Sequence, residues 1–419
     1  MELLLVLIGD FMAELAMVAL APVFTLLFVV LELVLEVALK VLGRPSLFRP
    51  RREAAPSKTP SPWPRRIGKV LLGLSLVFGI AMILLNTVLF EPTLRHGLAR
   101  AKEKSGVDVQ FQSARGNFLS GKATLDGVTI RRQDATRSNI DLQIKQIEVD
   151  LVLKSLYGSR VRVNRLHLSG VEGTYQRSAL KYPHRDFEIE QLLLEKASLV
   201  LKEPDSDPPA PSIALTVDRL ECRPLRGDSV LFDLLFRSTG QGTIVGAPFD
   251  IRSDRTEHGR ITAWKAQMLP VGFLSGYVGE PFDWLTAGTM DVDVIDTWSD
   301  GSSTEIDSRW KLMFRDVSAE VPPRITGFKR AIAEPVVRFI QAHPAQLPLE
   351  FQLTLQKGHF TGAASVETSG LLEAAADGML QELARRAQVP ADKLKELGRR
   401  ALEGFRKFVE DRKRKKSGD

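Results

Sequence analysis

The stretch SNIDLQIKQIEVDLVLKSLYGSRVRVNRLHLSG, residues 138–170, decides the fold. Its apolar and polar side chains alternate, which predicts β-strands with one buried face. The apolar phase moves by one residue between Ile144 and Ile147. Such a shift turns the following side chains to the opposite face unless the strand bends or bulges. We therefore expect bent strands that keep a single apolar face.

The same spacing, with apolar residues at i, i+2, i+5 and i+7, begins at Leu142, Val161, Phe187 and Leu215. The unequal intervals exclude a strict solenoid and favour an elongated, twisted antiparallel β-sheet with loops of different lengths. An apolar sheet face must be covered, so this sheet either folds over itself or forms a trough suited to acyl chains. The predicted lining of that groove consists of Leu142, Ile144, Ile147, Val149, Leu151, Val161, Val163, Leu166 and Leu168.

A membrane anchor is expected before the strands begin. Residues 70–90 carry no charge, and a helix of this length spans a hydrocarbon core of about 30 Å. A buried helix of a soluble protein would show a polar stripe, which is missing from this segment. The fold class is therefore a membrane-anchored, mainly β protein with N-terminal transmembrane helices.

Residues 1–42 form a second hydrophobic segment, whose longest uncharged window, residues 15–31, is just long enough to cross a membrane. Acidic residues on both sides of that window fall on one helical face, and two interpretations remain open. The acids lie at the two membrane interfaces, or they face a partner helix or a polar path. They are Asp10, Glu14, Glu32 and Glu36.

The loop between the two hydrophobic segments, residues 43–69, contains eight basic residues, one acid and six prolines. By the positive-inside rule this short loop is cytoplasmic, and its prolines make it an extended tether. We expect a bacterial inner-membrane protein with two spans, whose residues 91–419 are periplasmic. The loop's position between two spans favours topology and anionic lipid over nucleic acid as the reason for its charge.

The periplasmic part divides into a β-rich domain, residues 91–370, and C-terminal amphipathic helices with a basic tail, residues 371–419. Within the domain we expect a helix over 92–104 and paired strands at 289–297 and 307–317. A helix over 327–342 interrupted at Pro335 and strand structure over 348–368 follow. The apolar stripe of residues 391–416 either caps the sheet or lies on an anionic membrane surface.

Residues for catalysis or metal binding are not grouped in any familiar motif. The single cysteine, Cys222, excludes an intramolecular disulfide, and the six histidines lack metal-ligand spacing. Paired acids such as Asp291 and Asp293 alternate along a predicted strand, which is typical of a solvated face. We expect a protein that is not an enzyme and that has no cofactor, no metal and no nucleic-acid partner.

Two regions resemble AsmA-like envelope proteins. The first region begins with VDVQFQSARGNFLSGKATLDGVTI, residues 107–130, and continues to the run that ends at Leu168 and Gly170. The second region contains MLPVGFLSGYVGEPFDWLTAGTMDVDV, residues 268–294. It also contains LPLEFQLTLQKGHFTGAASVETSG, residues 347–370. The resemblance implies an inner-membrane anchor and a periplasmic, twisted β-groove that holds phospholipid chains. About fourteen strands would give roughly 70 Å of sheet, too short to bridge an envelope unaided.

These features predict a non-enzymatic protein that binds phospholipid or another acyl lipid and contributes to lipid transfer, lipid homeostasis or envelope assembly. The alternative is a scaffold without lipid cargo that docks envelope protein partners through sheet edges or through residues 1–42. Bound phospholipid favours the first function, and stable protein partners without bound lipid favour the second.

Overall fold

The computed structural model describes residues 90–117, 120–132, 139–157, 160–176, 187–202, 212–275, 282–299, 305–360 and 370–390, together with Gly73 and Gly79. The expected span over 15–31, the basic loop 43–69 and the stripe of residues 391–416 lie outside these ranges, as does the expected span over 70–90 apart from Gly73, Gly79 and Phe90. Among the described helices, none has the length and apolar character needed to cross a membrane.

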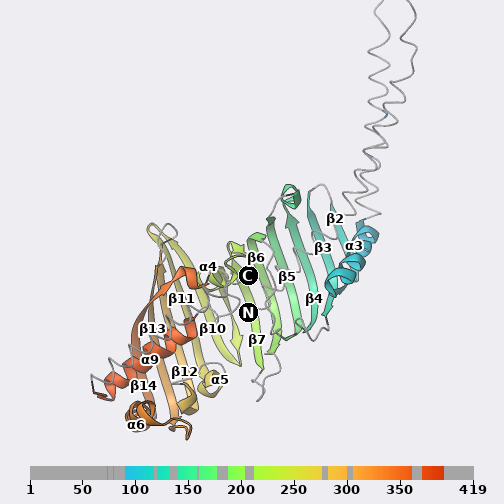
Figure 1. The fold of residues 1–419 in the computed structure, drawn as a ribbon. Helices are drawn as coiled ribbons and strands as arrows, with labels where there is room; N and C mark the ends of the chain where they lie inside the picture. Colours follow the sequence, from blue (N-terminus) through green and yellow to red (C-terminus); the bar gives the residue numbers. More distant parts are fainter. Residues whose placement is uncertain are drawn as a thin grey trace, which may run out of the picture.

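The described strands form one twisted, mixed sheet of 14 strands that does not close on itself (Figure 1). Along its main path the order is β1-β3-β4-β5-β6-β7-β9-β10-β11-β12-β13-β14, while β2 pairs with β3 and β8 with β6. The strands are β1 (Asp108–Gln110), β2 (Ser113–Asn117), β3 (Lys122–Arg132), β4 (Asn139–Leu151), β5 (Val161–Gln176), β6 (Phe187–Lys202), β7 (Ile213–Cys222), β8 (Leu225–Arg226), β9 (Ser238–Ile244), β10 (Ala247–Thr256), β11 (Gly259–Pro270), β12 (Leu285–Trp298), β13 (Glu305–Ala319) and β14 (Gln346–Gln356).

The prediction of a purely antiparallel sheet was wrong at one pair. Strands β5 and β6 run parallel, whereas the other strand pairs in the sheet are antiparallel. Alternation of apolar residues is the same in both kinds of strand, so the sequence pattern could not reveal the direction. In the parallel register Val161 lies opposite Phe187 and Leu168 opposite Leu194. The apolar residues at i, i+2, i+5 and i+7 of one strand therefore lie opposite those of the other.

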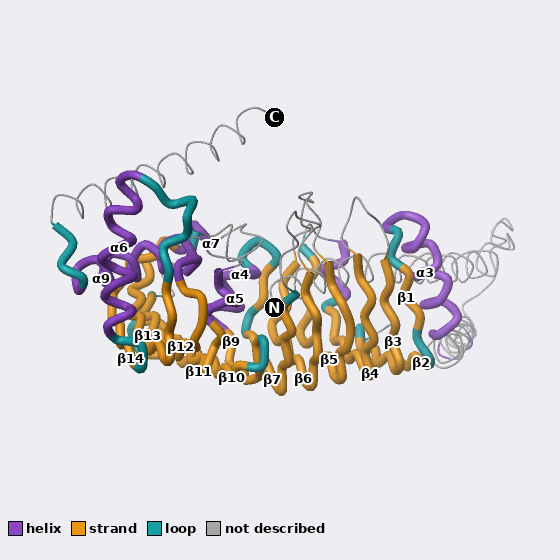
Figure 2. The backbone as a smooth tube through the Cα atoms, turned by 90° about the horizontal axis from the view of Figure 1, so that it is seen from below, coloured by secondary structure: helices purple, strands orange, loops and turns teal. Residues whose placement is uncertain are grey.

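The long strands bend without losing their apolar face, as expected. Gln146 pairs with Ser169, and Ile144 pairs with Val171. The one residue between these pairs on each strand is left out of the pairing, and on β5 this residue is Gly170. Gly170 has a φ of 63°, and Lys196, at the same level of β6, has a φ of 54°. These left-handed residues take up the one-residue shift in side-chain phase. Figure 2 shows the resulting strands curved toward one side.

The helices lie mainly on the side toward which the strands curve (Figure 2). They contact β1 and β2 at one end of the sheet and several strands from β7 to β14 in the other half. The described helices are α3 (Phe90–Ser105), η1 (Leu153–Tyr157), α4 (Val230–Arg237), α5 (Val271–Ser275), η2 (Phe282–Trp284), α6 (Gly327–Ala342), α7 (Lys357–Phe360) and α9 (Leu371–Arg386).

The predicted elements of the C-terminal half are partly confirmed. The expected strands over 289–297 and 307–317 lie within β12 and β13. The expected interruption at Pro335 was wrong, because α6 continues through the proline. Burial of Ile332, Val336 and Ile340 in an apolar cluster offsets the hydrogen bond that proline cannot make. The strand expected over 348–368 is confirmed as far as Gln356, and α7 follows over Lys357–Phe360, while residues 361–368 lie outside the described ranges.

Helix α4 was not predicted. Its sequence, VLFDLLFR, is a short apolar run that periodicity alone cannot assign to a strand or to a helix. All residues from Val230 to Phe236 are buried, since the helix lies between the inner sheet face and neighbouring elements. The prediction of a helix over 92–104 is confirmed, because α3 covers that range and ends before Gly106, whose φ is 71°.

Candidate functional site

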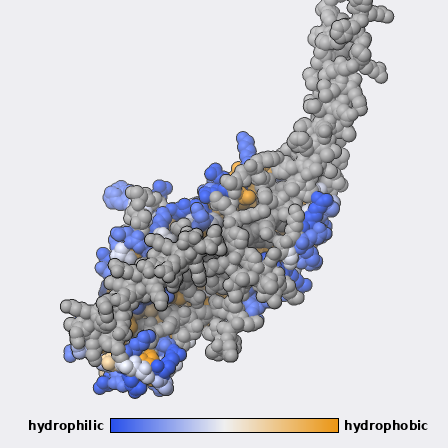
Figure 3. All heavy atoms as spheres, in the orientation of Figure 1, coloured by the Kyte–Doolittle hydropathy of each residue, from blue (hydrophilic) through white to orange (hydrophobic). Residues whose placement is uncertain are grey.

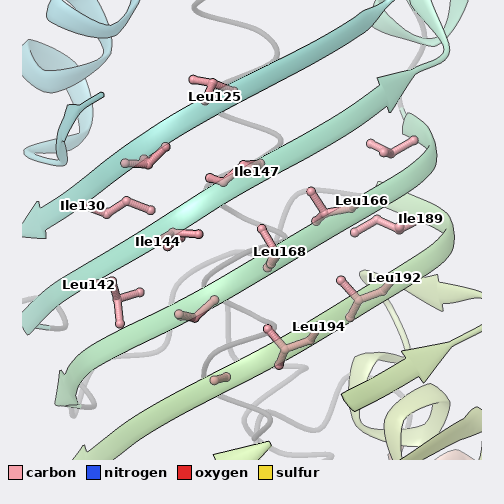
Figure 4. Close-up of a cluster of buried hydrophobic side chains, with 14 of the residues drawn as sticks. Leu125, Ile130, Leu142, Ile144, Ile147, Leu166, Leu168, Ile189, Leu192 and Leu194 are labelled. Atoms are coloured by element: carbon pink, nitrogen blue, oxygen red, sulfur yellow. The ribbon is translucent and has the colours of Figure 1, made fainter. Parts of the chain in front are cut away.

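The nine predicted lining residues share one face of β4 and β5. Eight are buried, and Val149 is partly buried and packs against the same cluster. Figure 4 shows five of them, Leu142, Ile144, Ile147, Leu166 and Leu168, beside residues of β3 and β6. The exposed fraction of Leu166 is 0% and that of Leu168 is 1%. The structure thus brings the predicted residues together on one face, where their side chains are buried or partly buried rather than exposed.

The apolar interior continues from the first helix into the second half of the sheet. One cluster joins Phe90 and Leu94 of α3 to Val230 and Leu234 of α4 through the inner faces of β3 to β7. Two further clusters cover the inner faces of β11 to β14 with α4 to α7 and α9. Figure 3 shows the described residues in view as mainly hydrophilic, with a few small hydrophobic patches among them.

Aromatic side chains are less completely covered in the second half of the sheet. Trp264 of β11 and Trp310 of β13 both lie opposite Val294 of β12, and Phe351 of β14 lies opposite Trp310. This aromatic row, Trp264–Val294–Trp310–Phe351, contains three partly exposed rings around a buried valine. The rings of Trp310 and Phe351 stack with their centroids 5.9 Å apart. The row bridges two apolar clusters, since Trp310 packs against both.

The next row along the strands is polar, and all its members but the partly exposed Ser253 are buried. It consists of Ser253, Thr262, Asp296 and Ser308, which are successive cross-strand neighbours from β10 to β13. The hydroxyls of Ser253 and Thr262 each donate a hydrogen bond of 2.8 Å to the carbonyl oxygen of Phe236 at the end of α4. The indole N–H of Trp310 donates to Ser308 Oγ over 2.8 Å, which joins the polar row to the aromatic row.

Asp296 is the chemically unusual member of this polar row. Its residue surface is only 2% exposed, and its Oδ1 atom has no hydrogen-bond partner. Burial raises the pKa of the Asp296 carboxyl from 3.8 to about 7, with a hydrogen bond from Ser308 opposing the shift. Asp233 of α4, also fully buried, instead has Arg226 bound through both carboxylate oxygens at 2.9 and 2.7 Å. Among the residues that the structure describes, Asp296 is therefore a buried carboxyl without a cation.

A third row lies on the other side of the polar row. Trp298 of β12 packs edge-on against Phe232 of α4, with ring centroids 4.8 Å apart. The guanidinium of Arg237 lies 5.2 Å from the Trp298 ring centroid, and Lys357 Nζ lies 5.5 Å from it. These two cations are therefore held over aromatic rings one row away from Asp296.

Comparisons with known proteins give limited support. No protein-family model matches the chain, so the AsmA-like resemblance stays a prediction. The chain is similar to "Mitochondrial distribution and morphology protein 31" of Saccharomyces cerevisiae, with 20% identity over 325 residues. That match covers 60% of this chain and 56% of the yeast protein. The chain thus spans little more than half the length of this curated relative.

The sequence analysis missed the residues of the polar row. Asp296 occupies an apolar phase of β12, two residues after Val294 and two before Trp298, and this misplaced acid was the available signal. The acids that were singled out lie elsewhere: Asp291 accepts the N–H of Met268 and pairs with Arg315, and Asp293 pairs with Lys265. Within the described ranges, no group of three or more histidine, cysteine, aspartate or glutamate side chains could hold a metal ion.

Proposed function

We propose that this chain is a non-enzymatic, membrane-anchored protein whose bent sheet holds the acyl chains of phospholipids on its inner face. The observation that carries this proposal is the continuous one-sided apolar face, which passes from β3 to β14 and includes partly exposed rings in the aromatic row. An acyl chain on such a face gains about 0.8 kcal/mol for each methylene removed from water.

The position of α3 supports a route between the membrane and this inner face. Phe90, the last residue of the expected span, lies against Gly116 of β2, where a Cβ atom would come within 2.1 Å of the Phe90 ring. Leu94 and Leu98 of the same helix belong to the cluster that lines the inner face. The anchor is therefore joined to the β1–β3 end of the sheet, which we place next to the membrane.

The dimensions of the sheet favour a local function. Twelve strands form its main path, because β2 and β8 pair beside other strands. At about 4.8 Å for each step this path is roughly 50 Å long, shorter than the expected 70 Å. We propose lipid transfer, lipid homeostasis or envelope assembly at the bacterial inner membrane, on the side opposite the basic loop.

Quantification of bound lipid tests this function. We expect the full chain, purified in mild detergent and washed extensively, to retain phospholipid at a defined ratio to protein, measured by native mass spectrometry and solvent extraction. A membrane protein of similar size with a single helical span, purified in parallel, gives the background. Phospholipid no higher than that background would contradict the proposal.

A scaffold function has one observation in its favour. Among the described strands, β14 pairs only with β13, so its other edge can add a strand from a partner protein. Crosslinking in intact cells that captured stoichiometric protein partners along β14, together with background levels of phospholipid, would favour this second function.

A further inference from the structure

Among the described residues, three unpartnered polar atoms lie in the polar row and in the rows on either side of it, and they are of two kinds. Asp296 Oδ1 can accept a hydrogen bond, whereas the indole N–H groups of Trp264 and Trp298 can only donate. All three atoms are buried without a partner. A buried polar group without a hydrogen bond costs free energy, so a ligand that supplies both a donor and acceptors is favoured at this place.

The surroundings of Asp296 favour a cation as the donor. Trp264 and Trp310 lie on either side of Val294, which is two residues from Asp296 on the same strand. Two indole rings beside a carboxyl group form the arrangement that recognises ammonium groups, through cation–π attraction and charge-assisted hydrogen bonds. Both rings are partly exposed, whereas Asp296 is 2% exposed, so the side of the aromatic row is the more accessible one.

Within the described ranges, no cation of the chain is found at this position. Arg237 and Lys357 lie over the rings of Trp298 and Phe232, in the row beyond Asp296. The raised pKa of Asp296 has burial as its main cause and no cation among its causes. An ammonium group arriving from the aromatic row would therefore meet a carboxyl that has no competing positive partner.

We propose that Asp296, Trp264 and Trp298 form the headgroup site of the bound lipid, selective for an amine-bearing zwitterionic phospholipid of the phosphatidylethanolamine class. The primary ammonium donates to Asp296 Oδ1, and phosphate or ester oxygens accept from the indole N–H groups. The acyl chains then lie along the aromatic row and the neighbouring apolar face. This assignment rests on the proposed function and names the substrate class of the same inner face.

Competition between two defined lipids tests the assignment. The full chain in detergent, stripped of endogenous lipid, is titrated with dioleoyl phosphatidylethanolamine and with dioleoyl phosphatidylglycerol, and bound lipid is counted by native mass spectrometry at pH 8. We expect the wild-type chain to bind the ethanolamine lipid about tenfold more tightly, because charge-assisted bonds are about twice as strong as neutral ones. Asp296→Asn should bring the two affinities within about twofold of each other.

The matched control is Asp307→Asn, which removes an exposed carboxylate on the outer face of the neighbouring strand. It should keep the wild-type preference. Equal binding of the two lipids by the wild-type chain, or a preference that survives Asp296→Asn, would overturn the headgroup site. Either result would leave the acyl-binding function standing. A site at Asp296 that holds only a water molecule would give this result. Failure of every protein to bind either lipid would overturn the proposed function itself.

Discussion

Replacing Leu166 with alanine is expected to lower the free energy of unfolding by about 3–5 kcal/mol. Leu166 has an exposed fraction of 0% and lies between Val149 of β4 and Leu192 of β6, so truncation leaves a cavity that the rigid sheet cannot close. Chemical unfolding of the purified chain, followed by tryptophan fluorescence, measures the loss. The five tryptophans make that signal strong.

The matched control is Arg165→Ala, one residue earlier on the same strand. Arg165 is exposed on the outer face, and its removal should change the free energy of unfolding by no more than about 0.5 kcal/mol. The difference between these neighbouring positions measures how one-sided the sheet is. Similar losses at both positions would contradict the account of a single apolar face kept through the bends.

Asp296→Asn is expected to stabilise the lipid-free chain, and more so at high pH. The folded pKa of about 7 lies above the usual 3.8, so the folded state binds more protons between these values. The contribution of Asp296 to stability should therefore fall as the pH rises from about 4 to about 7 and stay constant above that range. The difference between the folded and usual pKa values corresponds to at most about 4 kcal/mol of folding stability, because each pKa unit is worth 1.36 kcal/mol.

The asparagine of the variant does not titrate in this range. The variant should therefore be much more stable than the wild-type chain at pH 8 and only slightly more stable at pH 4. The basic side chains beside this row, Arg237, Lys357 and Arg260, are the same in both proteins. Thermal midpoints in detergent across the pH series measure the effect, with Asp307→Asn as the control that should show none. A variant less stable than wild type at pH 8 would disprove the linkage.

Much of the fold follows from short-range patterns. The i, i+2, i+5, i+7 spacing predicted bent strands with a constant apolar face, and the burial of Val161, Leu166 and Val171 along β5 confirms it. Alternation carries no information about strand direction, so the parallel pair β5–β6 could not be predicted. Helix α4 was missed because its identity depends on packing against distant strands rather than on local preference.

The candidate site was less accessible to sequence reasoning. The predicted groove residues were correctly placed on one face, but the burial of eight of them depends on contacts with distant segments, which the local pattern does not give. Asp296 and Trp310 are brought together by pairing β12 with β13, and Trp264 by pairing β11 with β12. The only signal in the sequence was Asp296, an acid at a position where the alternation predicts an apolar residue.

Photo-crosslinking from single positions of β11 tests most directly whether the inner face holds acyl chains. p-Benzoylphenylalanine replaces either Trp264, on the inner face, or Ile261, which is 40% exposed on the outer face. After irradiation in native membranes, intact-protein mass spectrometry should find acyl-lipid adducts at position 264 and only background at position 261. Equal adduct formation at the two positions, or adducts at position 261 alone, would contradict the account.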